Sequence, residues 1–299
     1  MPRKKAVASK PATDRAARKK SALRRPTDAP RTRPGKRPRL GVFTTTLWEY
    51  PSQHYDSPNL PATDAASRFQ GDKDYAGATP SWVIWQLLQR YTKPGDRVLD
   101  PMCGSGTTLD VCKDLDRRGK GFDLAPTRDD IEQADARELP LSGGVADFVF
   151  LDPPYSTHID YSDDPRCIGK LDAGERDDSY KPHRPDQPPE QIGAAYYEAM
   201  EEVISEMHRV LKDKHYAAIY VSDSFRKSKG KKGQGLLMPI GFELFSIARD
   251  YLVPVDIVGV VRHNAKLERG NWHKAAEEQN FFLRGFNYLL IFRKDDGAM

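Results

Sequence analysis

Residues 145–155 read Val145-Ala146-Asp147-Phe148-Val149-Phe150-Leu151-Asp152-Pro153-Pro154-Tyr155, a mostly apolar run that ends in an acid, two prolines and an aromatic residue. The run predicts a buried strand. Because proline has no N–H to continue a central ladder, the strand must end at Asp152. Asp152 and Tyr155 then lie at the carboxyl edge of a sheet, where open α/β sheets bind ligands. A carboxylate, an aromatic face and proline carbonyls suit a flat ring that carries an amino group, although a simple strand-ending turn with a buried Tyr has the same pattern.

A second stretch upstream predicts a ligand-binding turn. Residues 97–108 read Arg97-Val98-Leu99-Asp100-Pro101-Met102-Cys103-Gly104-Ser105-Gly106-Thr107-Thr108, which is the order strand, glycine turn, helix. The glycines let the backbone approach a ligand where a Cβ would clash, and the helix directs its positive end at the turn. The stretch is not a full GxGxxG and lacks the lysine of a phosphate-binding loop. A nucleotide phosphate is therefore not demanded, and an amino-acid carboxylate would serve as well.

The order of the elements predicts the fold class. A crossover helix at 107–118 leads to a strand at 119–124 that contains Asp123, close to where a dinucleotide fold places its ribose-binding acid. Asp135 opens a short third strand or turn at 135–140, and the fourth strand is 145–151. Strands that alternate with helices predict an α/β protein with a parallel, doubly wound sheet. Further helices are expected from Thr79-Pro80 to 92, at 193–212 and at 237–250, and further strands at 42–48, 214–222, 253–261 and 286–292.

The charge distribution separates a basic segment from an acidic body. Residues 1–40 carry 15 Lys and Arg against 2 Asp and Glu, whereas the whole chain has a net charge of only +4. The segment has almost no large apolar residue, so it cannot bury enough surface to order itself. We therefore predict a disordered basic tail at 1–40. It is either a solubilising extension or an electrostatic tether to nucleic-acid phosphates.

Cysteine usage and hydropathy limit the other classes of protein. The three cysteines show no paired spacing and no CxxC, so we expect neither a disulfide framework nor a metal site, which fits a reducing cytoplasm. No stretch approaches the ~20 apolar residues of a membrane span. The Arg-rich, acid-poor beginning is not a secretory signal, although an organelle transit peptide has a similar composition. We expect a cytoplasmic protein with no membrane partner.

The stretches 98–108 and 152–155 resemble the cofactor loop and the catalytic tetrad of the S-adenosylmethionine-dependent amino-methyltransferases of DNA, the N6-adenine and N4-cytosine DNA methylases. The resemblance covers about residues 75–292 and includes Thr79-Pro80, Asp123 and Asp135-Ala136-Arg137 as supporting matches. It implies a Rossmann-like, seven-stranded methyltransferase fold, with a mostly parallel sheet, one antiparallel strand and helices on both faces. Residues 41–299 would form this methyltransferase domain.

The resemblance also assigns residues to the cofactor, S-adenosylmethionine. The methionine part would lie against Asp100 and the glycine turn, with Thr79 near its carboxylate. Asp123 would bind the ribose, Asp135 would accept from the adenine amino group, and Phe122 and Leu124 would flank the adenine. The expected cofactor-binding residues are Thr79, Asp100, Pro101, Cys103, Gly104, Gly106, Thr107, Asp123, Leu124, Asp135 and Ala136.

By the same resemblance, Asp152, Pro153, Pro154 and Tyr155 are the catalytic residues. The lone pair of the target amino nitrogen is delocalised into its ring. Acceptance of its hydrogens by the Asp152 carboxylate and the Pro153 carbonyl would favour a pyramidal nitrogen, which attacks the methyl group in line. Tyr155 offers a ring for base stacking. A base inside a duplex cannot reach such a pocket, so base flipping is implied.

The loops 156–192 and 262–285 are the candidate DNA-contacting segments, because little other chain is available for target recognition. The first adjoins the tetrad and suits a substrate-contacting lid. DNA is thus the expected macromolecular partner, with a nucleoid-associated location. A cognate restriction endonuclease or a specificity partner is a further candidate.

Four functions compete. Asp152 at the head of the tetrad favours adenine N6 as the target, since N4-cytosine enzymes of the family more often have Ser there. The alternatives are methylation of cytosine N4 in DNA and methylation of a base amino group in RNA. A non-catalytic nucleic-acid-binding protein is the outside alternative, against which the intact glycine turn and tetrad argue.

Overall fold

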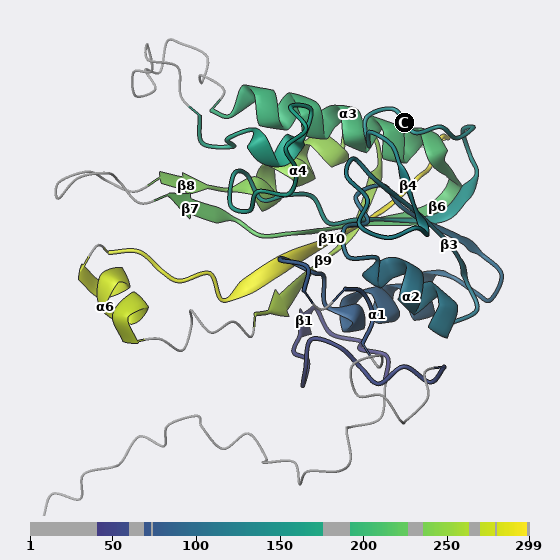
Figure 1. Cartoon of the computed structure of the whole chain (residues 1–299), viewed down its shortest axis with the longest axis horizontal. Helices are drawn as coiled ribbons and strands as arrows, with labels where there is room; N and C mark the ends of the chain where they lie inside the picture. The colour runs from purple at the N-terminus through teal and green to yellow at the C-terminus, as the bar shows by residue number, and fades with distance from the viewer. Residues whose placement is uncertain are drawn as a thin grey trace, which may run out of the picture. The chain divides into compact units, whose positions relative to one another are not determined.

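The computed structural model describes residues 41–59, 69–72, 74–175, 192–226, 236–262, 270–278 and 280–297 (Figure 1). The predicted basic tail at 1–40 lies outside the described residues. Within the described part of the chain, no helix has the length and apolar character needed to cross a membrane.

An eight-stranded sheet organises the fold, with the strand order β1-β9-β10-β6-β5-β2-β3-β4. β10 is antiparallel to its neighbours β6 and β9, and the other neighbouring pairs are parallel. The predicted mostly parallel sheet with one antiparallel strand is therefore confirmed. The strands are β1 Leu47–Trp48, β2 Arg97–Asp100, β3 Arg118–Asp123, β4 Ile131–Gln133, β5 Ala146–Leu151, β6 Leu211–Val221, β9 Val253–Val261 and β10 Phe286–Arg293.

The eighth strand is the short β1, which adds to the edge of the predicted seven. Its two residues pair with Gly259 and Val260 of β9. Trp48 anchors it, because its ring is buried with Tyr50 and Trp82 beside helix α1. Of the predicted strand at 42–48, only Leu47 and Trp48 form a strand, where the buried Trp48 ring holds the chain against the sheet.

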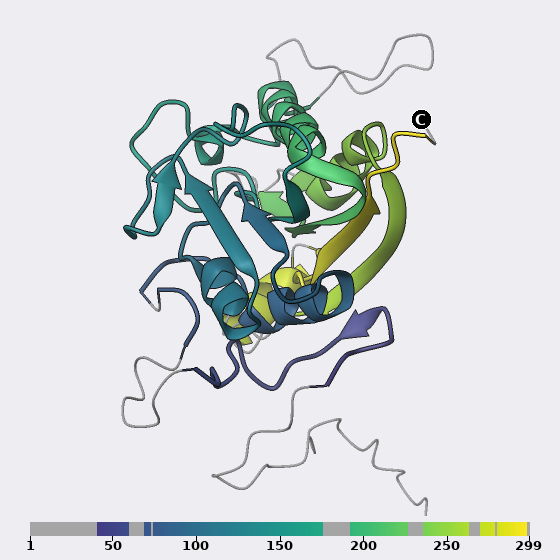
Figure 2. The same cartoon turned by 90° about the vertical axis from the view of Figure 1, so that its right-hand side faces the viewer.

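Helices cover both faces of the sheet, as predicted (Figure 2). α1 and α2 pack on one face, and α3 and α4 pack on the other. A short 3-10 helix, η1, lies in the loop after β5. The helices are α1 Ser81–Tyr91, α2 Thr107–Asp114, α3 Ala194–Val210, α4 Ile240–Ala248, α6 Gly270–Glu278 and η1 Ile168–Lys170.

Several boundaries differ from the sequence-based expectations. α2 ends at Asp114 and not at residue 118, because the chain turns at Asp116, whose φ is 60°. The third strand, β4, precedes Asp135, and 135–140 is a turn. Helix α6 and the two-stranded pair β7 (Ser224–Arg226) and β8 (Leu236–Met238) were not predicted, because they are short and lack a buried apolar repeat.

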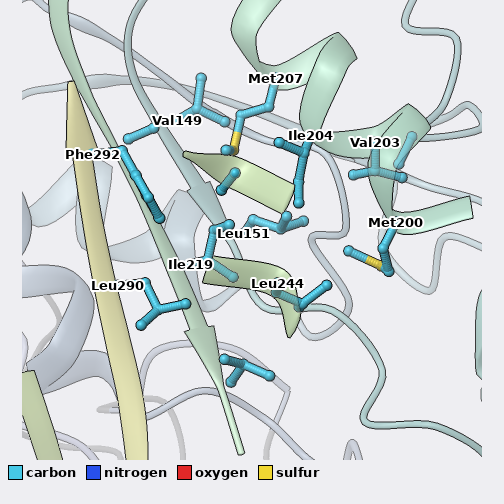
Figure 3. Packing of buried hydrophobic residues seen from close by; sticks show 14 of the residues in the cluster. Val149, Leu151, Met200, Val203, Ile204, Met207, Ile219, Leu244, Leu290 and Phe292 are labelled. Atoms are coloured by element: carbon cyan, nitrogen blue, oxygen red, sulfur yellow. The ribbon is translucent and has the colours of Figure 1, made fainter. Parts of the chain in front are cut away.

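β5 is the centre of the core. Val149 and Leu151 face α3 and α4, and Figure 3 shows them beside Met200, Ile204 and Leu244. The alternate residues of the strand, Phe148 and Phe150, pack against α1 instead. Because both faces are covered, every residue of β5 is buried, and the strand is apolar without the alternation of a half-exposed one.

The segment before α1 is held against the body by the carboxylate of Asp114 at the end of α2. Asp114 accepts hydrogen bonds from the Tyr55 hydroxyl at 2.9 Å and from the Gln70 amide at 3.0 Å, and a further one from the Ser57 hydroxyl. Tyr55 and Gln70 are both buried. This one carboxylate therefore anchors residues 55–59 and 69–72, which form no helix or strand.

We predict that Asp114→Ala lowers the free energy of unfolding by about 2–4 kcal/mol, because it leaves several buried donors without their charged acceptor. Urea denaturation followed by circular dichroism measures this loss. Asp129→Ala, at an exposed position after β3, is the matched control and should change the free energy by less than about 0.5 kcal/mol. Equal effects of the two substitutions would contradict the anchoring role.

Candidate active site

One cavity of about 830 Å³ lies at the carboxyl edge of the parallel strands. It is lined by residues that follow β2, β3, β4 and β5, by residues at the ends of β6 and β9, and by the beginning of the antiparallel β10. Phe122, which was expected to flank an adenine, is buried in the hydrophobic core and does not line the cavity. All the other predicted site residues except Pro153 and Gly106 line it. The sheet thus brings together residues that are far apart in sequence.

The two exceptions have structural explanations. Pro153 is buried behind the cavity surface. Gly106 has a φ of 79°, and a Cβ there would lie 2.4 Å from the Arg128 guanidinium. That guanidinium also binds the Ser105 carbonyl at 3.2 Å and both oxygens of Asp110 at 2.9 Å. Gly106 therefore makes room for an arginine that braces the glycine turn, which sequence reasoning did not identify.

Asp152 lies at the end of β5 between two hydroxyl groups. Thr79 donates to its Oδ2 at 2.5 Å, and Tyr155 donates to its Oδ1 at 2.8 Å. Desolvation raises the pKa of Asp152 to about 7, although both hydrogen bonds oppose the shift. Thr79 was expected near a cofactor carboxylate, so its bond to Asp152 is a contact that the sequence did not indicate. The result is a carboxyl group that is close to half-ionised at neutral pH.

The glycine turn after β2, in the stretch 97–108, is organised around Asp100. Its carboxylate accepts hydrogen bonds from the Thr108 hydroxyl at 2.5 Å and from the Met102 amide at 3.1 Å. Burial raises the pKa of Asp100 to about 7 as well. The Cys103 amide donates to the Phe122 carbonyl at 2.8 Å, which ties this turn to β3. Burial also raises the pKa of the Cys103 thiol, so the thiol stays protonated and is a packing group.

Asp123, the last residue of β3, links this strand to the glycine turn. Its Oδ2 accepts from the Gly104 amide at 2.9 Å, and its Oδ1 accepts from the Ala125 amide at 2.9 Å. A carboxylate has further lone pairs, so these bonds leave capacity for hydroxyl donors in the cavity. Gly104 has a φ of 46°, and a Cβ there would lie 2.9 Å from the Tyr75 hydroxyl. At this glycine the Tyr75 side chain approaches the backbone closely, and the predicted close approach of a ligand stays a prediction.

Asp135 is paired with Arg137, which reaches both of its oxygens at 2.9 and 2.7 Å. The guanidinium holds the pKa of Asp135 below its usual range, so the group is an ionised acceptor. Near it, the cavity is lined by Leu124, Ala136 and Ile168. An acceptor beside three aliphatic side chains suits a flat heterocycle that carries an amino group.

The loop after Tyr155 contributes a wall of the cavity. Its described part, 156–175, supplies His158, Ile159, Tyr161 and the residues around η1. The ring of Tyr161 stacks on that of Tyr75 at 6.2 Å between centroids, which joins this loop to the segment before α1. Residues 176–191 of the predicted lid lie outside the described residues. In the second predicted DNA-contacting loop, Arg262 lines the cavity, and α6 has no buried residue.

Sequence reasoning missed a group of cavity residues on the far side of β5. Tyr220 comes from the end of β6, and Asn287 comes from the beginning of β10. Tyr50 comes from the segment before α1. Asp100, Asp123 and Asp152 were identified because they lie at the carboxyl ends of predicted strands, and the same criterion would have identified Tyr220. Asn287 lies at the beginning of its strand, so it can be identified only once β10 is known to be antiparallel.

Among the described residues, no cluster of three or more His, Cys, Asp or Glu side chains is arranged to hold a metal ion. The cavity is therefore defined by carboxylates, hydroxyls and aromatic rings.

Comparisons with known proteins agree on a family. The model of a DNA methylase family matches residues 3–132 and 146–298. The type II methyltransferase M.HpaI of Haemophilus parainfluenzae is 31% identical over 97 residues, which is 32% of this chain and 26% of that protein. The type II methyltransferase M.Cfr9I of Citrobacter freundii is 44% identical over 63 residues, which is 20% of this chain and 21% of that protein. The matched part therefore spans about a quarter or less of each of these relatives.

The comparison with solved structures gives matches at low similarity only. A Thermus thermophilus protein described as a DNA modification methylase, in complex with S-adenosyl-L-methionine, has a TM-score of 0.34 and 16% identity over 55% of this chain and 54% of its own. Geranyl diphosphate C-methyltransferase of Streptomyces coelicolor has a TM-score of 0.42 and 14% identity over 72% of this chain and 79% of its own. At this level of similarity neither structure informs the chemistry of the site.

The raised pKa values of Asp100 and Asp152 predict how stability depends on pH. The folded protein binds these protons more tightly than the unfolded chain, so the free energy of unfolding should fall as pH rises from about 4 to about 7, by up to about 1.4 kcal/mol per pH unit for each group. Asp152→Asn removes one titrating group, so its slope should be smaller than that of the parent protein. Urea denaturation at several pH values measures both slopes, and identical slopes would show that burial does not raise the pKa of Asp152.

Proposed function

The chain belongs to the DNA methylase family, whose methyl donor is S-adenosylmethionine, and we propose that it transfers the methyl group to an exocyclic amino group of a base in DNA, with adenine N6 as the target. The observation that carries this proposal is the position of Asp152. It lies in the same cavity as the glycine turn of β2, between the hydroxyls of Thr79 and Tyr155. A carboxylate held in this way is an acceptor aimed at a group inside the cavity.

The residues present fit the cofactor. Asp100, Gly104 and the beginning of α2 would hold the methionine part, where the positive end of the helix dipole favours a carboxylate. Asp123 would bind the ribose hydroxyls with its remaining lone pairs. Asp135 would accept from the adenine amino group, with Leu124, Ala136 and Ile168 against the ring. When bound, the cofactor supplies an electrophilic methyl group on a sulfonium sulfur.

Asp152 prepares the target nitrogen for attack. By accepting one amino hydrogen, its carboxylate disfavours delocalisation of the nitrogen lone pair into the ring. Transfer of the methyl group would leave the nitrogen with a positive charge, while the bonding electron pair would stay on the sulfur of the leaving cofactor. Asp152, with a pKa of about 7, is well matched to take the departing proton at neutral pH. Tyr155 fixes the carboxylate through its hydroxyl, and its ring lines the cavity where a base would stack.

The role of Pro153 as acceptor of the second amino hydrogen stays a prediction. Pro153 is buried, whereas its neighbour Pro154 lines the cavity. The Pro154 carbonyl already accepts from the Tyr196 hydroxyl at 2.7 Å and from the Ser156 amide at 3.1 Å. These bonds fix the turn after Asp152, which makes Pro154 and Tyr196 positioning residues in the proposed mechanism.

The choice of adenine over cytosine rests on Asp152 at the head of the tetrad, where N4-cytosine enzymes of the family more often have Ser. DNA is the proposed partner macromolecule, reached through Arg262 at the end of β9, the loop after Tyr155 and the residues around α6. The names of the relatives M.HpaI and M.Cfr9I support a place beside a restriction endonuclease, and a cytoplasmic, nucleoid-associated location follows from the substrate.

We predict that Asp152→Asn lowers the rate of methyl transfer to DNA at least about 100-fold, because the amide no longer offers a charged acceptor or takes a proton. Tritium transfer from labelled S-adenosylmethionine to unmethylated DNA, with a matched RNA as second substrate, measures the rate. Cofactor affinity, measured by calorimetry, should change less than about threefold. Asp147→Asn is the matched control, since Asp147 lies at the opposite end of β5 and binds Lys212 and the Arg97 amide.

Two outcomes would count against the proposal. Transfer to RNA but not to DNA by the parent protein would overturn the choice of substrate. Loss of cofactor binding together with transfer in Asp152→Asn would make Asp152 a structural residue.

The pH dependence of transfer should follow the ionisation of Asp152. Since its pKa is raised to about 7 and the ionised form is the acceptor, kcat/KM should rise with pH through about 7 and level off above about 8. Steady-state rates between pH 5.5 and 9 measure the profile. A profile that is flat from pH 5.5 to 8 would contradict a carboxylate with a raised pKa at the reaction centre.

A further inference from the structure

Three unpaired polar atoms belong to residues that line the cavity. Among the described residues, six buried side-chain nitrogen or oxygen atoms have no hydrogen-bond partner. Three of them belong to cavity-lining residues, namely the Tyr50 hydroxyl, the Asn287 Oδ1 and the His54 Nδ1. Buried polar groups are normally paired, because an unpaired one keeps the full cost of its desolvation. Their concentration at one cavity indicates a polar ligand that completes them.

Asn287 is the best-defined of the three. It is 6% exposed and lies at the beginning of β10, opposite Val260 of β9. Because β10 is antiparallel to β6 and β9, its first residues reach the edge where those strands end. Asn287 and Tyr220 line the same cavity, and the Asn287 Oδ1 is an acceptor without a partner. The amide oxygen is therefore buried and unsatisfied at the cavity.

Tyr220 connects Asn287 to the reaction centre. It is 4% exposed, and its register partner on β10 is Leu289, so it lies on the same face of the sheet as Asn287. The charges of Asp152 and Arg262 both act on the Tyr220 hydroxyl, with opposite effects on its pKa. The Asn287–Tyr220 pair is thus within electrostatic range of the carboxylate that the reaction uses.

Tyr50 is held rigidly on the same wall. Its ring stacks between those of Phe43 and Trp82, at centroid distances of 5.6 and 5.7 Å. Packing on both faces leaves little freedom to the ring, so the position of its hydroxyl is set before any ligand binds. Tyr50 and Tyr220 belong to the same buried cluster and line the same cavity.

The strand order separates this wall from the cofactor residues. β5, which carries Asp152, lies between β6 and β10 on one side and β2, β3 and β4 on the other. The proposed cofactor residues follow β2, β3 and β4, whereas Tyr220 and Asn287 belong to β6 and β10. A ligand that meets the cofactor at Asp152 must therefore approach from the β6–β10 side.

We propose that Asn287, Tyr220 and Tyr50 form the wall that receives the flipped target base, with the Asn287 Oδ1 accepting an N–H hydrogen of the base and the Tyr50 hydroxyl binding its ring edge. The inference rests on the proposed function, since it takes the ligand to be a base turned out of DNA. Asn287 is then a specificity-determining residue of that reaction. The alternative is that ordered water completes these atoms and that their role is structural.

Binding to two duplexes separates these roles. The first duplex carries the target site, mapped from the methylation product of the parent protein, and the second has an abasic position in place of the target base. Asn287→Ala should weaken binding to the first about tenfold, the usual effect of a lost buried hydrogen bond, and leave binding to the second unchanged. Fluorescence anisotropy in the presence of sinefungin measures both affinities.

The control for the binding experiment is Tyr288→Phe. This substitution removes a hydrogen bond to Asp223 from the next residue of β10 and should leave both affinities unchanged. If Asn287→Ala folds poorly, Tyr220→Phe tests the same wall, with an expected loss of about fivefold on the intact duplex alone. Equal losses on the two duplexes, or no loss on either, would overturn the assignment. If the parent protein methylates no DNA, the proposed function fails first, and the assignment fails with it.

Discussion

The structure depends on one constraint at the end of β5, where two prolines follow Asp152 and end a strand that is buried on both faces. Because the ladder cannot continue, the carboxylate stays at the edge of the sheet, where its neighbours are the hydroxyls of Thr79 and Tyr155. Burial raises its pKa to about 7 and makes it both a hydrogen-bond acceptor and a proton acceptor. Burial thus raises the pKa of the Asp152 carboxyl group, and the two hydrogen-bond donors fix its orientation.

Because β5 lies within the sheet, residues from strands on both of its sides surround Asp152 in the cavity. Strands on one side of β5 supply Asp100, Asp123 and Asp135, and strands on the other supply Tyr220 and Asn287. The segment before α1 closes the cavity with Tyr50 and Tyr75 and is itself held by Asp114 at the end of α2. Under the proposed function, the cofactor and the target base would meet at Asp152 from opposite directions, which is the geometry that in-line transfer needs.

Much of this was predictable from sequence, because the relevant residues follow apolar runs. The positions of Asp100, Asp123 and Asp152 at strand ends, and the helices on both faces, follow from the alternation of elements. Other features depend on long-range contacts that have no local signal. Thr79 is 73 positions from its partner Asp152, and Asn287 reaches the cavity only because β10 is antiparallel. Gly106 has the expected residue type, but its neighbour is the Arg128 guanidinium and not the cavity.

The most direct test identifies the product. The protein is incubated with S-adenosylmethionine that carries a deuterated methyl group and with unmethylated DNA, and the DNA is then digested to nucleosides for mass spectrometry. We expect the deuterated methyl group on the N6 amino group of deoxyadenosine. Label on N4 of deoxycytidine would refute the choice of base. Label on a ring carbon, or none in any nucleoside, would contradict the central claim that Asp152 directs an amino nitrogen at the methyl group.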